Sequence, residues 1–459
     1  MKAYRKGNIL VMALVFSALA LSMVVTSISG FGFMENRAAK QKHGSEMAFQ
    51  IAEAGIEYYK WHLAHDEDDY QDGTGAPGPY VHDYFDKDGG KIGEYSLSIT
   101  PPPAGSSIVT VESTGYTTAY PDTKRKLKAR IGFPSLTDYA FLTNSDVWIG
   151  DNEAIHGKLH ANGGIRFDGT TDSIISSAKE TYTCKTFHGC NNQIKPGIWG
   201  DGEPENFWQF PVPAFDFNGI TVDLAEVKAG AQSSGVYLSS SGKKGWHLKF
   251  KADGTFDAFK VTSLYPIPSP GYGKDVNGVK HYESYDIKTE IFYQNYSLPA
   301  NGLIFVEDLT WVDGTVHGKA TVGSGKFPVS PATYTSIAIP NNIIYTAKDG
   351  TDVLGLMAQN HILIPRKSPD TLEIDAAMIA QNGSAQRFYY PGNILNNLTI
   401  YGSVVSNGVW TWSWVTQGGS ITSGYKNTNT TYDANLTFGP PPSFPVGNGY
   451  QLISWEEVK

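Results

Sequence analysis

The sequence predicts an α+β protein, mainly β: a long N-terminal helix, a small antiparallel sheet, and then a β-helix-like domain. Three observations support this fold class. Residues 8–34 contain no charged side chain, and apolar residues with helical spacing continue to about residue 65. After that point, short runs of β-branched and aromatic residues alternate with Gly, Asn and Pro. The chain has 459 residues, which is enough for two or three domains.

The N-terminal segment has the composition of a membrane anchor. Residues 1–7, MKAYRKG, form a basic leader with three cations. The uncharged stretch 8–34 would span about 40 Å as a helix, more than the roughly 30 Å hydrocarbon core of a bilayer. Because the cations precede this stretch, we expect a single-pass inner-membrane protein with its N-terminus in the cytoplasm and its C-terminal domain outside. A plain anchor and a cleaved signal peptide are the alternatives.

The same helix is predicted to continue as an amphipathic segment, so that residues 8–65 form one transmembrane and amphipathic helix. Five residues recur at spacings of 3, 4, 3 and 4 and form one helical stripe: Phe49, Ala52, Ile56, Tyr59 and Leu63. We expect this stripe to pack against the strands that follow. Glu53 and Glu57 lie away from the stripe and are expected to be exposed.

The leader, the apolar helix and the stretch AFQIAEAGIE (48–57) together resemble the PilX-type N-terminal family of type IV pilin-like pilus-assembly proteins. This resemblance implies cleavage by a prepilin peptidase between Gly7 and Asn8. It also implies contact with other pilin-like subunits, in a type IV pilus or a related secretion system. Pilins usually carry Glu at the fifth mature position, where this sequence has Met12. That departure is seen in some minor pilins, so the resemblance favours a minor, structural or assembly role over that of a major subunit.

Residues 66–134 are predicted to form a pilin-like antiparallel sheet. Strand-like runs occur at 93–100, 107–116 and 125–133, with turn residues between them. A pilin packs the second half of its helix against such a sheet, so the resemblance places the helical stripe on these strands.

Residues 135–459 are predicted to form the β-helix-like domain, with a β-sandwich as the alternative. The stretch 301–325, NGLIFVEDLTWVDGTVHGKATVGSG, shows the short β-branched clusters and Gly-containing turns that suit stacked coils. An elaboration is expected at about 170–300, with a helix near 217–235 and a hairpin at 246–261 that turns at Asp253-Gly254. The tail 440–459 is expected to fold back over this domain as a covering strand.

Charge and cysteine content narrow the function classes. A net charge of −9 argues against a nucleic-acid partner, because no broad basic face is available to replace phosphate counterions. Cys184 and Cys190 are the two cysteines, and in an exported chain we favour a disulfide between them. The histidine spacings suit no metal site, and no phosphate-loop, dinucleotide or nucleophile motif is present. We therefore predict no metal, no cofactor, no catalytic residue and no enzymatic activity.

Two further features keep a second function open. Trp410, Trp412 and Trp414 alternate along one predicted strand, where they could pack on a core edge or contact a protein partner or a surface glycan. Glu373 and Asp375 share a strand face, as acids of a carbohydrate-active β-helix would. The alternative function is thus a membrane-anchored carbohydrate-binding or carbohydrate-degrading surface protein. The first interpretation is a minor pilin-like protein that displays a large extracellular β domain, for adhesion or assembly, in a surface filament.

Overall fold

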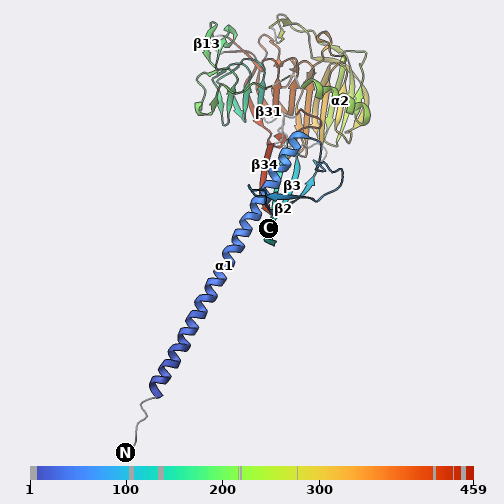
Figure 1. Cartoon of the computed structure of the whole chain (residues 1–459). Helices are drawn as coiled ribbons and strands as arrows, with labels where there is room; N and C mark the ends of the chain where they lie inside the picture. Colours follow the sequence, from blue (N-terminus) through green and yellow to red (C-terminus); the bar gives the residue numbers. More distant parts are fainter. Residues whose placement is uncertain are drawn as a thin grey trace, which may run out of the picture. The chain divides into compact units, whose positions relative to one another are not determined.

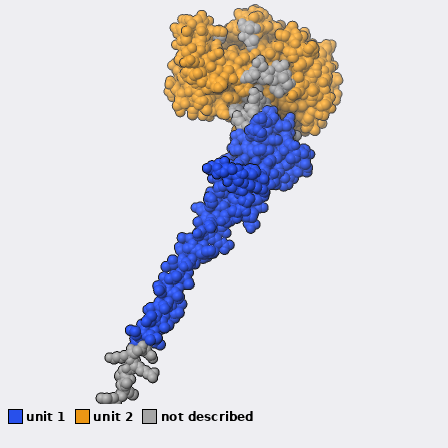
Figure 2. All heavy atoms as spheres, viewed as in Figure 1, with its two compact units in different colours: residues 1–102, 108–132, 449–459 blue, residues 103–107, 133–448 orange. Residues whose placement is uncertain are grey.

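The computed structural model describes residues 8–102, 108–132, 139–215, 217, 220–275, 278–416, 420–437, 439–445 and 451–458. The chain divides into two compact units, shown in blue and orange in Figure 2. Unit 1 comprises Met1–Pro102, Ile108–Gly132 and Gly449–Lys459, and unit 2 comprises Pro103–Ser107 and Phe133–Asn448. The predicted leader, including Gly7, lies outside the described residues. One long helix followed by strands confirms an α+β chain that is mainly β.

The described residues of unit 1 form one helix and one sheet. Helix α1 (Asn8–His65) is a single continuous element, drawn in blue in Figure 1. Its 58 residues span about 87 Å. The five strands pair antiparallel in the order β1 (Tyr80–Phe85), β2 (Lys91–Thr100), β3 (Val109–Thr117), β4 (Tyr120–Gly132) and β34 (Gln451–Val458). The three predicted strands correspond to β2, β3 and β4, whereas β1 and β34 were not predicted as members of this sheet.

The position of β34 corrects the prediction for the C-terminal tail. We expected residues 440–459 to cover the large domain, but β34 pairs along the edge of β4, with Leu452 opposite Ile131 and Trp455 opposite Ala129. The last strand of the chain therefore completes the first sheet, and unit 2 is inserted in the sequence between β4 and β34. An alternating pattern predicts that a segment forms a strand, but it does not predict which strand edge it will pair with.

In unit 2, parallel ladders join neighbouring coils into three rows. The first row contains β16 (Val236–Leu238), β22 (Leu303–Val306), β24 (Lys319–Ser324), β27 (Val353–Ala358), β29 (Thr371–Ala380), β31 (Ile394–Ser406), β5 (Phe141–Thr143), β8 (Leu159–Ala161), β11 (Ile175–Ser177) and β15 (Trp208–Gln209). The second contains β17 (Gly245–Lys251), β23 (Thr310–Val316), β25 (Ile337–Ala338), β28 (Ile362–Ile364) and β30 (Ala385–Arg387). The third runs from β23 through β26 (Ile343–Tyr345), β29, β31, β33 (Ile421–Tyr432) and β7 (Glu153–His156) to β10 (Thr170–Thr171). Such parallel stacking is β-helix-like and differs from the antiparallel ladders of a β-sandwich.

The remaining elements of unit 2 are short or lie beside these rows. A further parallel set contains β6 (Val147–Ile149), β9 (Ile165–Phe167) and β14 (Ile198–Trp199). Antiparallel pairs are formed by β12 (Thr181–Cys184) with β13 (Gln193–Pro196), β17 with β18 (Thr255–Leu264), β18 with β21 (Ile287–Ser297), β19 (Gly273–Lys274) with β20 (Lys280–His281), and β32 (Ser413–Val415) with β33. Helix α2 spans Ile220–Ser234, and short 3₁₀ turns occur at Thr186–His188, Glu205–Phe207, Pro331–Thr333 and Ala434–Thr437.

The coils do not stack in sequence order. Strands β5 and β7, from the start of unit 2, pair with β31 and β33, from its end. Asparagine side chains bridge this junction: Asn144 Nδ2 donates to Asn407 Oδ1 and Asn162 Nδ2 donates to Asn144 Oδ1, each at 2.8 Å. Because each amide both donates and accepts, the side chains align the turns of coils that are far apart in sequence.

The core of unit 2 has an inner and an outer part. Inward-facing residues of the rows, such as Ile304, Leu356 and Val404, form one large buried cluster. Helix α2 covers the outward face of the first row. Its predicted apolar face, which consists of Leu224, Val227 and Ala231, is buried there, and Leu436 and Phe444 belong to the same buried cluster.

The predicted elaboration at about 170–300 needs a correction, because β10, β11, β15, β16 and β17 within it belong to the rows. Strands β18 and β21 extend the second row antiparallel at β17. The hairpin of β17 and β18 turns where predicted, and Gly254 adopts a positive φ of 78° there.

Candidate functional site

The first part of α1 presents an uncovered apolar surface. Its large apolar side chains from Ile9 to Met34 are between 52% and 78% exposed. By length and composition the helix can cross a membrane once, and its most apolar window is not buried within the chain. An apolar surface of this extent requires lipid or another apolar partner.

The second part of the same helix is buried on the sheet of unit 1. Four of the five predicted stripe residues are at most 4% exposed (Ala52, Ile56, Tyr59 and Leu63), and Phe49 is partly buried. Glu53 and Glu57 are exposed, as expected. One uninterrupted helix therefore joins an uncovered apolar segment to a packed one.

Glycines bring the helix backbone close to the sheet. A Cβ atom on Gly115 of β3 would lie 2.3 Å from the carbonyl oxygen of Ala48 and 2.4 Å from the backbone nitrogen of Ala52. A Cβ atom on Gly55 of α1 would lie 2.4 Å from the hydroxyl of Ser113. Both approaches are possible only without a side chain. The sequence interpretation did not find this role of Gly115, because a glycine in a strand signals several different features.

The C-terminal strand β34 packs against Phe49, the partly buried residue at the start of the stripe. The Phe49 ring lies edge-on to the Trp455 ring at 6.0 Å between centroids, and the Arg125 guanidinium lies 5.2 Å from the Phe49 centroid. Arg125 also forms an ion pair with Glu457 and donates to the Ser45 hydroxyl at 2.9 Å. Residues from α1, β4 and β34 thus meet around one aromatic ring.

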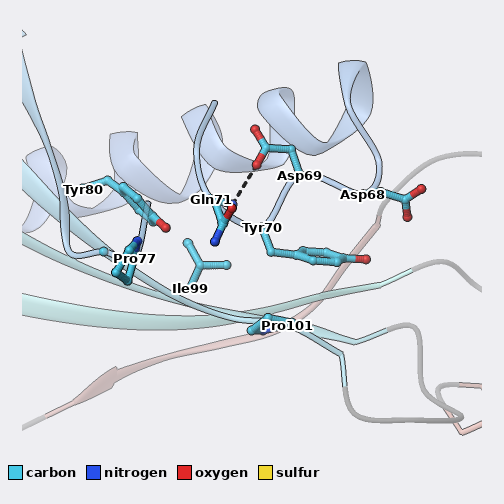
Figure 3. A pocket seen from close by; sticks show the side chains of 9 residues that line it. Asp68, Asp69, Tyr70, Gln71, Pro77, Tyr80, Ile99 and Pro101 are labelled. Carbon is cyan, nitrogen blue, oxygen red and sulfur yellow. Dashed lines mark hydrogen bonds between the residues drawn. The ribbon is translucent and has the colours of Figure 1, made fainter. Parts of the chain in front are cut away.

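An acidic loop after α1 borders a cavity of about 420 Å³, lined by Asp68, Asp69, Tyr70, Gln71, Pro77, Gly78, Tyr80, Ile99 and Pro101 (Figure 3). The Asp69 carboxylate accepts the backbone N–H groups of Gln71 and Gly73 and lies 3.0 Å from His62 Nε2. Burial opposes ionisation of Asp69, but these partners outweigh it and lower the pKa of the carboxyl. The carboxylate therefore holds the loop together. Within the described ranges, no group of three or more His, Cys, Asp or Glu side chains is placed to hold a metal ion.

The three tryptophans predicted for one strand face are separated by the structure. Trp410 and Trp412 are buried in the core of unit 2, and Trp410 stacks on Phe141 at 3.8 Å. Of the three alternatives for these tryptophans, core packing therefore applies to Trp410 and Trp412, and neither is available to a partner or a glycan. Trp414 lies on β32, is partly buried, and donates its indole N–H to the carbonyl oxygen of Arg387 at 2.8 Å.

The two acids considered for carbohydrate chemistry form a compact ion cluster. Lys348 Nζ lies 2.9 Å from Glu373 Oε1 and 2.8 Å from Asp375 Oδ1, and Asp375 also accepts the backbone N–H of Tyr345. Asp375 is fully buried, and burial raises the pKa of its carboxyl despite these partners. The arrangement leaves Asp375 without access to a substrate.

The two cysteines form a disulfide that joins Cys184, at the end of β12, to Cys190 in the connection between β12 and β13. The carbonyl oxygen of His188, inside the closed loop, accepts a hydrogen bond from Arg166 at 3.0 Å. The Arg166 guanidinium in turn lies over the Trp148 ring at 4.3 Å and the Trp199 ring at 5.2 Å. The disulfide loop is thus held against β6, β9 and β14.

Comparisons with known proteins assign no family to the chain. No family model matches the sequence, and no curated protein matches it. Among solved structures, the chain is similar to the competence-associated pilin ComZ from Thermus thermophilus, with 14% identity, covering 90% of this chain and 97% of that chain. The TM-score is 0.30, which is too low to support a conclusion about fold or function.

Proposed function

We propose that this protein is a minor pilin-like subunit of a type IV pilus or a related secretion system, with a structural or assembly role. The observation that carries the proposal is the division of α1. One continuous helix is uncovered and apolar in its first part and packed on an antiparallel sheet in its second part. A signal peptide that is cleaved off would not be expected to continue as one helix into the folded domain.

The proposed mechanism follows from the exposed apolar surface. The first part of α1 resides in the inner membrane as a single pass, with the basic leader inside and with the sheet of unit 1 and the whole of unit 2 outside. During assembly the helix moves from the bilayer into a filament, where apolar side chains of neighbouring helices replace lipid. Met12 at the fifth mature position and the long insertion of unit 2 favour a rare, tip or initiating position over that of a major subunit.

The N-terminus of the mature protein tests this proposal. When the full chain is expressed with a prepilin peptidase, mass spectrometry should find a chain that starts at Asn8, and this product should be absent without the peptidase. The variant Gly7→Val should remain uncut, whereas Gly30→Ala, a change within the helix, should still be cut. A start near Ser22 or later would contradict the proposal and indicate a signal peptide. An uncut wild-type chain would indicate a plain anchor.

We assign a structural rather than an enzymatic role, since Lys348 pairs with both Glu373 and Asp375. Incubation of the full chain with a panel of glycans should release no sugar. Release that is lost in the double variant Glu373→Gln, Asp375→Asn would replace this assignment with the carbohydrate-degrading alternative.

A further inference from the structure

Three aromatic rings from separate elements of unit 2 form one cluster. Tyr272 precedes β19, Tyr389 follows β30, and Trp414 lies on β32. The ring centroids are 5.4 Å apart for Tyr272 and Tyr389, 5.5 Å for Tyr272 and Trp414, and 5.7 Å for Tyr389 and Trp414. Each of the three residues is only partly buried, so the cluster is not closed off from solvent. Tyr272, Tyr389 and Trp414 together form an aromatic triad.

The backbone holds the triad in place. Tyr272 and Tyr389 exchange two backbone hydrogen bonds, at 3.1 and 2.8 Å. A Cβ atom on Gly273 would lie 2.0 Å from the Phe388 ring, so the hairpin of β19 and β20 sits directly on that buried ring. The indole N–H of Trp414 is fixed on the carbonyl oxygen of Arg387. Because the rings are already ordered, a ligand would not have to order them on binding.

Polar groups adjoin the triad. Lys280 Nζ lies over the Tyr272 ring, 4.0 Å from its centroid, and Lys274 Nζ lies over the Trp414 ring, 5.8 Å from its centroid. Asp275 Oδ2 lies 3.3 Å from His281 Nε2 on the same hairpin. Ammonium donors therefore lie at two of the three rings, and a carboxylate–imidazole pair lies on the same hairpin as Tyr272.

We propose that the aromatic triad is a binding site for an oligosaccharide. One face of a pyranose ring presents C–H groups, whose partial positive charge is attracted to the negative face of an aromatic ring. The hydroxyl groups around the sugar need donors and acceptors, and the lysines and Asp275 supply both. This inference does not depend on the proposed pilin-like role. The chain's net charge of −9 disfavours the other ligand class that stacks on aromatic rings, single-stranded nucleic acid.

Binding by the full chain in detergent micelles tests the site. A panel of neutral and acidic polysaccharides is immobilised, and the affinity of each is measured for wild type and variants. At least one glycan should bind wild type, and Trp414→Ala should weaken it about tenfold or more, as expected when one stacking ring is lost. Tyr282→Ala is the matched control, because Tyr282 is 60% exposed and is not a member of the triad. This control should bind like wild type.

Trp414→Ala also removes a hydrogen bond to Arg387, so two milder variants accompany it. Tyr272→Ala and Lys280→Ala should each weaken the same glycan several-fold, while circular dichroism and the melting temperature match wild type. Equal binding by wild type and by both of these folded variants would overturn the site. The site would also be overturned if no glycan bound to wild type. The same conclusion would follow if single-stranded DNA bound in a manner that depends on Trp414 while no glycan bound.

Discussion

Raising the pH should destabilise unit 2 through one buried histidine. His247 on β17 lies between two carboxylates: its Nδ1 is 2.8 Å from Glu290 Oε2 on β21, and its Nε2 is 3.2 Å from Asp313 Oδ2 on β23. The Phe259 ring on β18 lies 5.7 Å away, centroid to centroid. Burial alone would lower the pKa of His247, but the ion pairs with Asp313 and Glu290 outweigh burial and raise the pKa to about 9.

The sign of the effect follows from linkage. The folded pKa of about 9 exceeds the ordinary histidine value of 6.5, so the protonated ring is the form that the fold stabilises. This stabilisation is fully present below about pH 6.5 and is lost as the pH rises through 9. The difference between the two pKa values corresponds to about 3 kcal/mol of unfolding free energy. At high pH, two carboxylates would remain beside a neutral ring.

Urea unfolding of the full chain in micelles, followed by tryptophan fluorescence from about pH 6 to about pH 10, measures this loss. The control is His247→Gln, which keeps a polar side chain but has no titrating group in this range. Burial also raises the pKa of the Glu153 carboxyl to about 8, so ionisation of this group also destabilises the fold as the pH rises within the measured range. Glu153 is present in both proteins, so its contribution cancels when their pH profiles are compared. Wild type should therefore lose about 3 kcal/mol more than the variant across the range. Parallel pH profiles for the two proteins would refute the reasoning.

Three further predictions concern the packing of each unit. Gly115→Ala should destabilise unit 1 by about 3 kcal/mol, because the new methyl group would meet the α1 backbone. Gly30→Ala is the control and should not destabilise it, because nothing lies within 4 Å of a Cβ atom at that position. Thermal unfolding compares the two variants, and equal melting temperatures would contradict the close approach of Gly115 to α1. Deleting Gln451–Val458 should expose the edge of β4 and increase hydrogen exchange in β4 but not in the rows of unit 2; unchanged exchange in β4 would contradict the role of β34. Replacing Cys184 and Cys190 with Ser should cost about 2 kcal/mol of local stability in the β12–β13 hairpin, because the small closed loop is released, and faster proteolysis of that hairpin than in wild type would show it.

Short sequence patterns correctly predicted the elements whose formation depends on residues close together in the chain. The absence of charge in residues 8–34 and the regular spacing of Phe49, Ala52, Ile56, Tyr59 and Leu63 predicted one helix with two different environments, and α1 has both. Alternating residues predicted β2, β3 and β4, and Asp253-Gly254 predicted a hairpin turn. Each of these features depends on neighbours within a few residues, so the sequence alone is sufficient.

The open alternatives and the errors concern partners that are distant in the chain. The alternation of Trp410, Trp412 and Trp414 left core packing and partner contact open. Trp410 and Trp412 are buried in the core, where Trp410 stacks on Phe141. Trp414 lies on β32 and donates to the carbonyl oxygen of Arg387. The tail was assigned to the wrong domain because the free edge of β4 lies more than three hundred residues upstream of β34.

The sequence by itself therefore determined the apolar helix, its stripe, the short strands and the turn that joins β17 to β18, since hydrophobic periodicity and turn chemistry are local properties. Only the tertiary structure decided that β34 closes the first sheet, that the early coils stack on the last ones, and that Tyr272, Tyr389 and Trp414 meet. Those arrangements depend on which backbone edges and side chains remain unsatisfied after the local elements form. Many edges of similar pattern are available in a chain of short strands, and a pattern alone does not distinguish between them.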